Sequence, residues 1–225
     1  KKVLVVAAHP DDEVLGVGGV ILRHVAEGDE VSILILGDGE TSRKEEVVDV
    51  EKRAGQADKT GELFGVKKVY RENLPDNAFD TVALLEIVKK VEAVVDEARP
   101  EVIYTHHQYD LNVDHRLTCQ AVLTACRPQP VHPTKKILTF ETLSSTEWQV
   151  KDLGNSFCPT VYVDISEYLE KKMEVLRVYD NEMREYPHPR SYEGVEVLAK
   201  FRGMEVGLRA AEAFQLVRDV GSKFF

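Results

Sequence analysis

Four short apolar runs in the first half of the chain are rich in β-branched residues, as expected for strands that are buried on both faces. They comprise residues 3–8, 31–36, 69–70 and 101–105. The segments between these runs have the spacing or the composition of helices, and each ends at or close to a glycine or a proline. These helical segments comprise residues 15–28, 41–64 and 82–98. Strands that alternate with helices in this way predict a parallel sheet with helices on both faces.

The second half of the chain is less regular. A helix is predicted over residues 114–125, strands over 135–142 and 160–164, and two further helices over 166–184 and 192–218. No linker separates the two halves, so residues 1–225 are predicted to form a single domain. The fold class is therefore α/β, with a doubly wound, mostly parallel sheet.

The composition narrows the class of protein without defining its activity. The formal net charge of −10 argues against a nucleic-acid partner, because phosphate binding needs a basic surface. No apolar run approaches the roughly 20 residues that span a bilayer, so no membrane span is expected. Cys119, Cys126 and Cys158 show neither a disulfide framework nor a metal-binding spacing, which predicts a reducing, cytoplasmic location. The sequence leaves the oligomeric state open and is compatible with a homo-oligomer.

Candidate chemistry is concentrated after the first and the fourth predicted strand. The sequence HPDDE begins at His9, and HHQYDLNVDH occupies residues 106–115; together they hold four of the seven histidines. In a doubly wound sheet, ligands bind outside the carboxyl ends of the strands, where the strand order reverses. These two loops flank that reversal in the commonest strand order. They are therefore predicted to form one site.

The residue types in these two loops suit a metal-dependent hydrolase. Hydrolytic zinc sites usually take three ligands from His, Asp or Glu and leave a fourth position for water. His9, Asp12 and His115 can supply such a set. Asp11 cannot easily share the ion with its neighbour, because adjacent side chains diverge. Its carboxylate is then free to take a proton from water, which is the role of a general base.

Each of these residues also has an ordinary structural explanation. Asp11 or Asp12 could cap the N-terminus of the following helix, which is a common use of Asp after a turn. His115 could be a structural histidine at the start of a helix. Capping does not account for His9 and the second Asp together. The joint placement of these residues at adjacent strand ends favours metal-dependent hydrolysis.

The same segments resemble the LmbE-like, or PIG-L-like, N-acetylglucosaminyl deacetylases. Ala8–Glu13 (AHPDDE), followed by Leu15–Gly19 (LGVGG), is similar to the first motif of that family. Residues 105–116 resemble its second metal motif, and Arg202–Gly203 and Ala211–Phe214 resemble its C-terminal pattern. The resemblance covers nearly the whole chain. It implies a Rossmann-like fold and zinc-dependent removal of the acetyl group from an N-acetylated amino sugar or its conjugate.

The resemblance also implies roles for individual residues. His9, Asp12 and His115 fall on the Zn²⁺ ligand positions of the family. Asp11 falls on its general-base position. Arg53 falls where many members have an arginine that contacts the substrate, although this alignment is looser.

One position departs from the pattern of the family. Many members have a histidine three residues before the last metal ligand, thought to polarise the substrate carbonyl or assist the leaving group; this chain has Asn112. Asn can donate a hydrogen bond to an oxyanion but cannot deliver a proton near neutral pH. His106, His107 or His188 could take over that function, or the zinc ion could polarise the carbonyl alone; His188 could also border the substrate. Asp114 could orient a ligating histidine or cap a helix.

The predicted substrate is a small-molecule N-acetyl amino sugar or conjugate, and the predicted cofactor is Zn²⁺. Two alternatives stay open. The first is an amidase that acts on a thiol-sugar conjugate. The second is a non-catalytic module that binds a sugar or nucleotide, although no GxGxxG motif follows the first strand.

Overall fold

One seven-stranded sheet forms the centre of the protein. The computed structural model describes residues 1–39, 50–130, 132–152 and 154–221, in which the strands pair in the order β3-β2-β1-β4-β5-β7-β6. Their bounds are Lys2–Ala7 (β1), Glu30–Gly37 (β2), Lys68–Leu74 (β3), Val102–His106 (β4), Lys136–Phe140 (β5), Val161–Asp164 (β6) and Ala211–Asp219 (β7). Strands β1 to β5 pair in parallel, whereas β7 is antiparallel to both β5 and β6. The sheet is therefore mostly parallel, which confirms the prediction.

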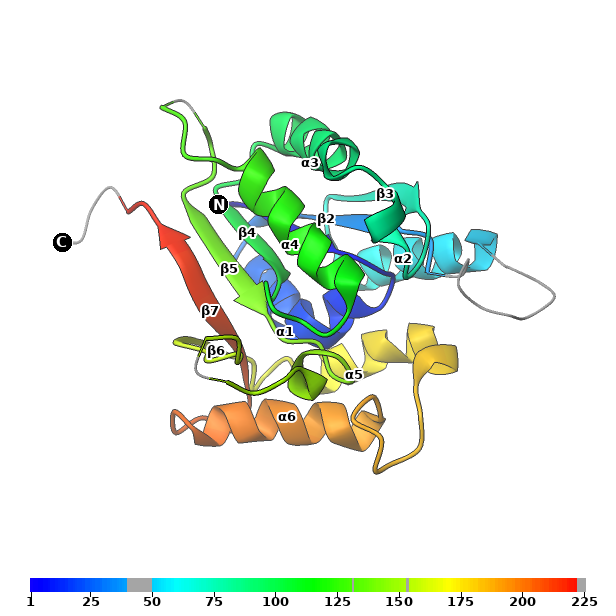
Figure 1. The fold of residues 1–225 in the computed structure, drawn as a ribbon. Helices are drawn as coiled ribbons and strands as arrows, with labels where there is room; N and C mark the ends of the chain where they lie inside the picture. Colours follow the sequence, from blue (N-terminus) through cyan, green and yellow to red (C-terminus); the bar gives the residue numbers. More distant parts are fainter. Residues whose placement is uncertain (40–49, 131, 153, 222–225) are drawn as a thin grey trace.

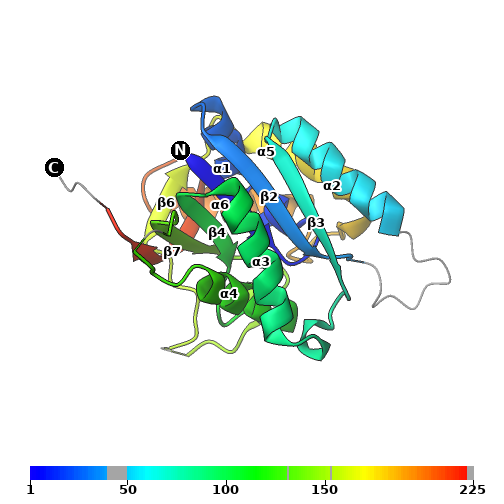
Figure 2. The same cartoon turned by 90° about the horizontal axis from the view of Figure 1, so that it is seen from above.

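Helices cover both faces of this sheet. The α-helices of the described residues are Asp12–Ala26 (α1), Val50–Phe64 (α2), Leu84–Ala98 (α3), Val113–Ala125 (α4), Leu169–Leu176 (α5) and Tyr192–Met204 (α6). Figure 1 and Figure 2 show α3 and α4 on one face of the sheet and α1, α2 and α5 on the other. The predicted α/β fold class, with helices on both faces, is confirmed.

The central strand β1 shows why its apolar run is continuous. Val3 and Val5 belong to the apolar cluster beneath α1, α2, α5 and α6. Leu4 and Val6 belong to a second cluster, beneath α3 and α4. Successive side chains of a strand point to opposite faces, so a strand with helices on both sides must be apolar at every position.

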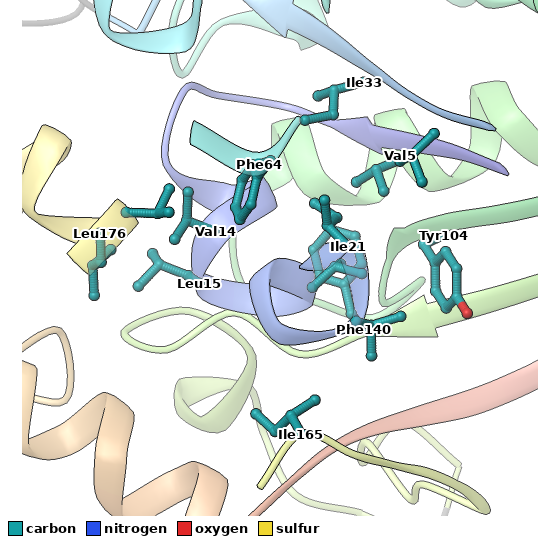
Figure 3. Close-up of a cluster of buried hydrophobic side chains, with 14 of the residues drawn as sticks. Val5, Val14, Leu15, Ile21, Ile33, Phe64, Tyr104, Phe140, Ile165 and Leu176 are labelled. Atoms are coloured by element: carbon teal, nitrogen blue, oxygen red, sulfur yellow. The ribbon is translucent and has the colours of Figure 1, made fainter. Parts of the chain in front are cut away.

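Close packing of α1 against its surroundings explains the LGVGG segment. A Cβ atom on Gly16 would lie 2.3 Å from Cδ2 of Phe140, and one on Gly19 would lie 2.7 Å from Cγ2 of Ile165. Both distances are far below van der Waals contact, so only glycine fits at either position. Figure 3 shows Phe140 and Ile165 together with Leu15 in this cluster.

A buried ion pair ties α1 to α5 and β7. The carboxylate of Glu212 accepts hydrogen bonds from the backbone amides of Gly19 and Val20, each at 2.8 Å. It also accepts one from Lys172 Nζ at 2.7 Å, and Lys172 Nζ donates to the carbonyl oxygen of Leu15 at 2.8 Å. The two charged side chains are only 3% and 5% exposed. Charges this deeply buried are tolerated because every one is paired or hydrogen-bonded.

The structure corrects two helices predicted in the second half of the chain. The helix predicted over residues 192–218 ends at Met204, and Ala211–Asp219 forms the strand β7 instead. Gly207 has a φ of 75°, a left-handed conformation that ends a helical path, and the following residues pair with β5 and β6. The helix predicted over residues 166–184 is the short α5, followed by a 3-10 helix at Arg177–Glu182.

Two further expectations concern particular segments. The helix predicted over residues 41–64 is present from Val50 to Phe64, and residues 41–49 lie outside the described part of the chain.

Within that described part, no helix combines the length and the apolar character that a membrane crossing requires.

Candidate active site

The loops after β1 and β4 meet at one edge of the sheet, because these two strands are parallel neighbours. His9 lies in the first loop, Asp12 opens α1, and His115 lies in the first turn of α4. One side-chain donor atom of each residue lies within 4.8 Å of those of the other two. The structure thus brings together the three residues that the sequence predicts as metal ligands.

Asp12 lies at the centre of this group. Its Oδ2 atom is 3.4 Å from His9 Nδ1 and 3.3 Å from His115 Nε2. Its Oδ1 atom is buried and has no hydrogen-bond partner among the described residues. A buried carboxylate oxygen without a partner is costly. Two imidazoles and one carboxylate facing each other around it are a donor set that fits a divalent transition-metal ion.

Carboxylates hold the outer nitrogen atoms of the two histidines. His9 Nε2 lies 2.9 Å from Oδ2 of Asp114 and 3.2 Å from Oδ1 of Asp76. His115 Nδ1 lies 3.1 Å from Oδ1 of Asp110. The hydrogen bond between His9 Nε2 and Asp114 fixes the tautomer of His9 and directs its other nitrogen, which is how metal-ligating histidines are usually oriented. The contact between His115 and Asp110 is an ion-pair distance without the geometry of a hydrogen bond. This pattern leaves His9 Nδ1 and His115 Nε2 to face Asp12.

The acidic surroundings change the pKa values of both histidines. Burial alone would disfavour the charged form of His9, but Asp114 and Asp12 outweigh it and raise the pKa to about 10. Burial also disfavours the charged form of His115, but the charges of Asp12 and Asp110 outweigh it and raise the pKa of His115 to about 9. The carboxylates therefore create a buried environment that favours positive charge.

Asp11 lies beside this group in an unusual backbone conformation. Its φ is 115°, and its side chain makes no capping hydrogen bond to α1. Its backbone amide donates to Oε2 of Glu13 at 2.9 Å, and Arg190 Nη1 donates to its Oδ2 at 3.0 Å. A strained non-glycine residue persists only where its surroundings hold it, and such residues cluster at functional sites. The capping explanation thus does not account for the Asp11 side chain.

The pKa of Asp11 suits proton transfer near neutral pH. Burial disfavours the carboxylate and raises this pKa to about 6, although the charge of Arg190 acts in the opposite direction. A general base works best when its pKa lies near the working pH. The arrangement can therefore place a base beside a candidate metal position.

Glu13 stabilises the turn that contains Asp11. It accepts hydrogen bonds from the hydroxyl of Tyr179 at 2.8 Å and from Thr60 Oγ1 at 3.2 Å. Burial raises its pKa to about 7. Its contacts therefore fix the backbone of Asp11.

A cleft of about 510 Å³ opens at this edge of the sheet and is lined by His9, Asp11 and His115. The remaining walls come from several loops and from α2. Their residues include Arg53, Asp76, Asn112, Ser144, Trp148 and Arg190. Trp148 is 50% exposed, so a large aromatic ring stands at the rim of a polar cleft.

Two residues predicted to contact the substrate line this cleft. Arg53 is only 3% exposed, and its Nη2 atom lies 2.6 Å from Oε1 of Glu182, so it does not belong to a solvated helix face. Asn112 is the N-cap of α4: its Oδ1 accepts from the amide of Asp114, and its Nδ2 donates to Oδ1 of Asn77. Asp114 is therefore not the cap and uses its carboxylate on His9 and on the amide of Phe79.

The three histidines considered as substitutes for the family histidine do not line the cleft. His106 is fully buried; its Nε2 accepts from the amide of Ala8, and burial lowers its pKa to about 4. His107 Nε2 bonds to the carbonyl oxygen of Asn155. The ring of His188 packs edge-on against Trp148, with the two ring centroids 5.6 Å apart.

Sequence patterns alone do not reveal three residues at this site. Asp76 contacts His9 and Asp110 contacts His115, but neither aspartate stands beside either histidine in the sequence. Arg190 reaches Asp11 across 179 positions of the chain. For the two aspartates, the sequence offers one signal, which is the clustering of aspartates at the ends of the predicted parallel strands.

The fold and the site together define a class of protein: an α/β domain with a His–Asp–His cluster and a second Asp beside a cleft at the strand ends. The chain belongs to the family described as GlcNAc-PI de-N-acetylase (PIG-L), which matches residues 4–126, more than half of its length. The family resemblance predicted from the sequence motifs is thereby confirmed.

One relative in sequence and two solved structures illustrate what this chain is similar to. The diacetylchitobiose deacetylase of Thermococcus kodakarensis is 26% identical over 231 residues, which cover 98% of this chain and 84% of that protein. The N,N′-diacetylchitobiose deacetylase of Pyrococcus horikoshii is similar in structure, with a TM-score of 0.78, 22% identity, and coverage of 97% and 84% of the two chains. The 4-carboxy-2-hydroxymuconate hydratase of Pseudomonas putida, with a TM-score of 0.79, 20% identity and complete coverage of both chains, has the same fold. One fold thus supports different reactions, so activity must be argued from the site.

Proposed function

We propose that the protein is a metal-dependent deacetylase that hydrolyses the N-acetyl group of an amino sugar or a small amino-sugar conjugate. One observation carries this proposal: donor atoms of His9, Asp12 and His115 lie within 4.8 Å of one another, and His9, His115 and Asp11 line one cleft. Membership of the de-N-acetylase family supports the same reaction.

The metal position is proposed at His9 Nδ1, Asp12 and His115 Nε2. Two imidazoles and one carboxylate favour zinc among the common divalent ions. When bound, such an ion supplies Lewis acidity, which acidifies water and polarises a carbonyl group.

Asp11 is proposed as the general base. Its carboxylate takes a proton from the attacking water as the water oxygen bonds to the acetyl carbon. The C–N bond then breaks, and the same proton can pass to the leaving nitrogen, giving acetate and a free amine. Asn112, which lines the cleft, is the neutral donor proposed to face the carbonyl oxygen, because His106 and His107 do not line it.

The walls of the cleft suit a sugar. Arg53 and Asn112 present hydrogen-bonding groups, and Trp148 presents an aromatic surface at the rim. Hydroxyl groups of a hexose need such polar partners, whereas the C–H faces of its ring pack well on an aromatic side chain.

The test combines metal analysis with a substrate panel. Protein purified without chelator is expected to contain one divalent ion per chain and to release acetate from N-acetylglucosamine derivatives, including N,N′-diacetylchitobiose. Removal of the ion should abolish release, and zinc should restore it. Protein that binds no added transition metal and releases no acetate from any member of the panel would contradict the proposal.

The same panel separates the alternatives. A thiol-sugar conjugate that is cleaved in preference to the other substrates would indicate the amidase. Sugar or nucleotide binding without turnover would indicate a binding module. Because a hydratase shares the fold, water addition to 4-carboxy-2-hydroxymuconate is measured as well.

Arg53→Ala is expected to raise KM more than it lowers kcat. Loss of a charged hydrogen-bond donor that positions the substrate costs about 1.5–3 kcal/mol, or roughly tenfold to a hundredfold in KM. Steady-state kinetics check this result, with Arg71→Ala as the control, because Arg71 pairs with Asp58 on the exposed surface. Equal kinetic constants for Arg53→Ala and wild type would remove Arg53 from the substrate site.

A further inference from the structure

The backbone of Arg190 is fixed by hydrogen bonds of both its amide and its carbonyl group. It lies two positions before α6, in the loop that closes one side of the cleft. Its backbone amide donates to Nδ1 of His188 at 3.1 Å, and its carbonyl oxygen accepts from the amide of Arg184 at 2.9 Å. The side chain is 21% exposed and reaches into the cleft from this anchored backbone.

The guanidinium group of Arg190 bridges two loops. Nη1 donates to Oδ2 of Asp11 at 3.0 Å, and Nε donates to Oγ of Ser144 at 3.1 Å. A guanidinium is planar and rigid, so two hydrogen bonds in different directions fix its orientation. Ser144, whose φ is 65°, is itself held through its amide by Glu147.

The carboxylate of Asp11 is held on one side only. Its Oδ2 atom accepts from Arg190, whereas Oδ1 accepts no hydrogen bond from any residue in the described part of the chain. Asp11 lines the cleft and does not cap α1. One oxygen is therefore anchored, and the other is available to a molecule in the cleft.

We propose that Arg190 is a positioning residue, whose guanidinium holds one oxygen of the Asp11 carboxylate so that the other oxygen faces the cleft. This inference rests on the proposed function, in which Asp11 accepts a proton from water. It goes beyond that function because it assigns the orientation of the base to a residue 179 positions away.

The expected cost of losing this contact follows from the geometry of proton transfer. A displacement of about 1 Å in a reacting group can lower the rate roughly a hundredfold. Binding of substrate and metal depends less on the orientation of the Asp11 carboxylate than proton transfer does. The proposal therefore predicts an effect on kcat with little effect on KM or on metal content.

Two substitutions at Arg190 test the positioning role. Arg190→Gln is expected to lower kcat roughly tenfold to a hundredfold on N,N′-diacetylchitobiose. KM and metal content should stay within about twofold of wild type. Arg190→Lys should recover part of the loss, because an ammonium can still donate to Asp11 but cannot also reach Ser144 in the same fork. Arg184→Gln, in the same loop but exposed, is the matched control and should leave kcat unchanged.

Ser144→Ala tests the second anchor of the guanidinium. Loss of a neutral hydrogen bond is worth about 0.5–1.5 kcal/mol, so kcat should fall roughly twofold to tenfold. The same substitution in the Arg190→Gln background should cause no further loss, because Ser144 then has no guanidinium to orient.

Crystal structures of wild type and Arg190→Gln give a readout that does not depend on activity. The Asp11 carboxylate is expected to rotate or to occupy two conformers in the variant. An unmoved carboxylate overturns the positioning role, whether or not kcat falls. Equal losses of kcat in Arg190→Gln and Arg184→Gln overturn it as well. Wild type without deacetylase activity would refute the proposed function instead, and the crystal structures would still decide the role of Arg190.

Discussion

Asp11→Asn is expected to lower deacetylation about 10²–10⁴-fold while the protein keeps its metal, because removal of a general base typically costs that much. The amide is nearly isosteric with the carboxylate, and its oxygen can still accept the hydrogen bond from Arg190 Nη1. The backbone of Asp11 stays tied to Glu13 through its amide. Folding should therefore survive, and the loss should appear in kcat.

Asp12→Asn is the matched comparison, one residue away on the same turn. Asp12 Oδ2 faces both His9 and His115, so its loss should lower metal content and activity together. Metal analysis and turnover are measured on both variants side by side. Loss of metal from Asp11→Asn with retention in Asp12→Asn would reverse the two roles. Near-normal turnover and metal content in both variants would contradict the hydrolase proposal itself.

The contrast between these adjacent residues illustrates how much of the site could be predicted from the sequence. A parallel sheet places the ends of neighbouring strands together, so the sequence predicts that the HPDDE and NVDH segments meet. The divergence of adjacent side chains then separates Asp11 from Asp12. The structure places both as this reasoning requires, with the Asp11 carboxylate toward Arg190 and that of Asp12 toward the histidines.

The supporting residues could not be predicted in the same way. Arg190 reaches Asp11, and Ser144 reaches Arg190, from loops whose paths depend on tertiary packing. Neither residue has a periodic or motif-like signal. Asp110 precedes His115 by five positions, and its carboxylate contacts that histidine across the loop before α4. Asn112 was predicted as a donor in the cleft, yet the structure also shows it capping α4.

The fold was predictable where local pattern and tertiary environment agree. The run in β1 is apolar at every position because helices cover both faces. The segment Ala211–Phe214 is rich in alanine, which favours a helix in isolation, but pairing with β5 and β6 makes it a strand. Its Glu212 interrupts an otherwise apolar stretch, and the reason lies in α1 rather than in β7.

Glu212→Gln is expected to destabilise the protein by about 3–5 kcal/mol, because it leaves the charge of Lys172 buried without its partner. The amide also cannot accept from both Gly19 and Val20, which donate to the two carboxylate oxygens. For a protein of this size the melting temperature falls by about 2–4 °C per kcal/mol. Chemical denaturation and thermal unfolding measure the loss.

Lys171→Met is the control for this prediction. Lys171 is the neighbour of Lys172 and pairs with Glu174 at 2.8 Å, but both side chains are largely exposed. Exposed pairs contribute about 0–1 kcal/mol, so this variant should unfold almost like wild type. A loss as large as that of Glu212→Gln would show that charge on α5, rather than burial of the pair, sets the stability.

Replacing both partners together should recover much of the stability lost in Glu212→Gln. In Lys172→Met/Glu212→Leu no buried charge remains, and apolar replacements of similar volume are often neutral or stabilising. Removal of Lys172 Nζ also releases the carbonyl oxygen of Leu15, to which the amide of Gly19 can donate in the ordinary i→i−4 pattern. A double variant no more stable than the single one would show that α1 needs the carboxylate itself to hold Gly19 and Val20.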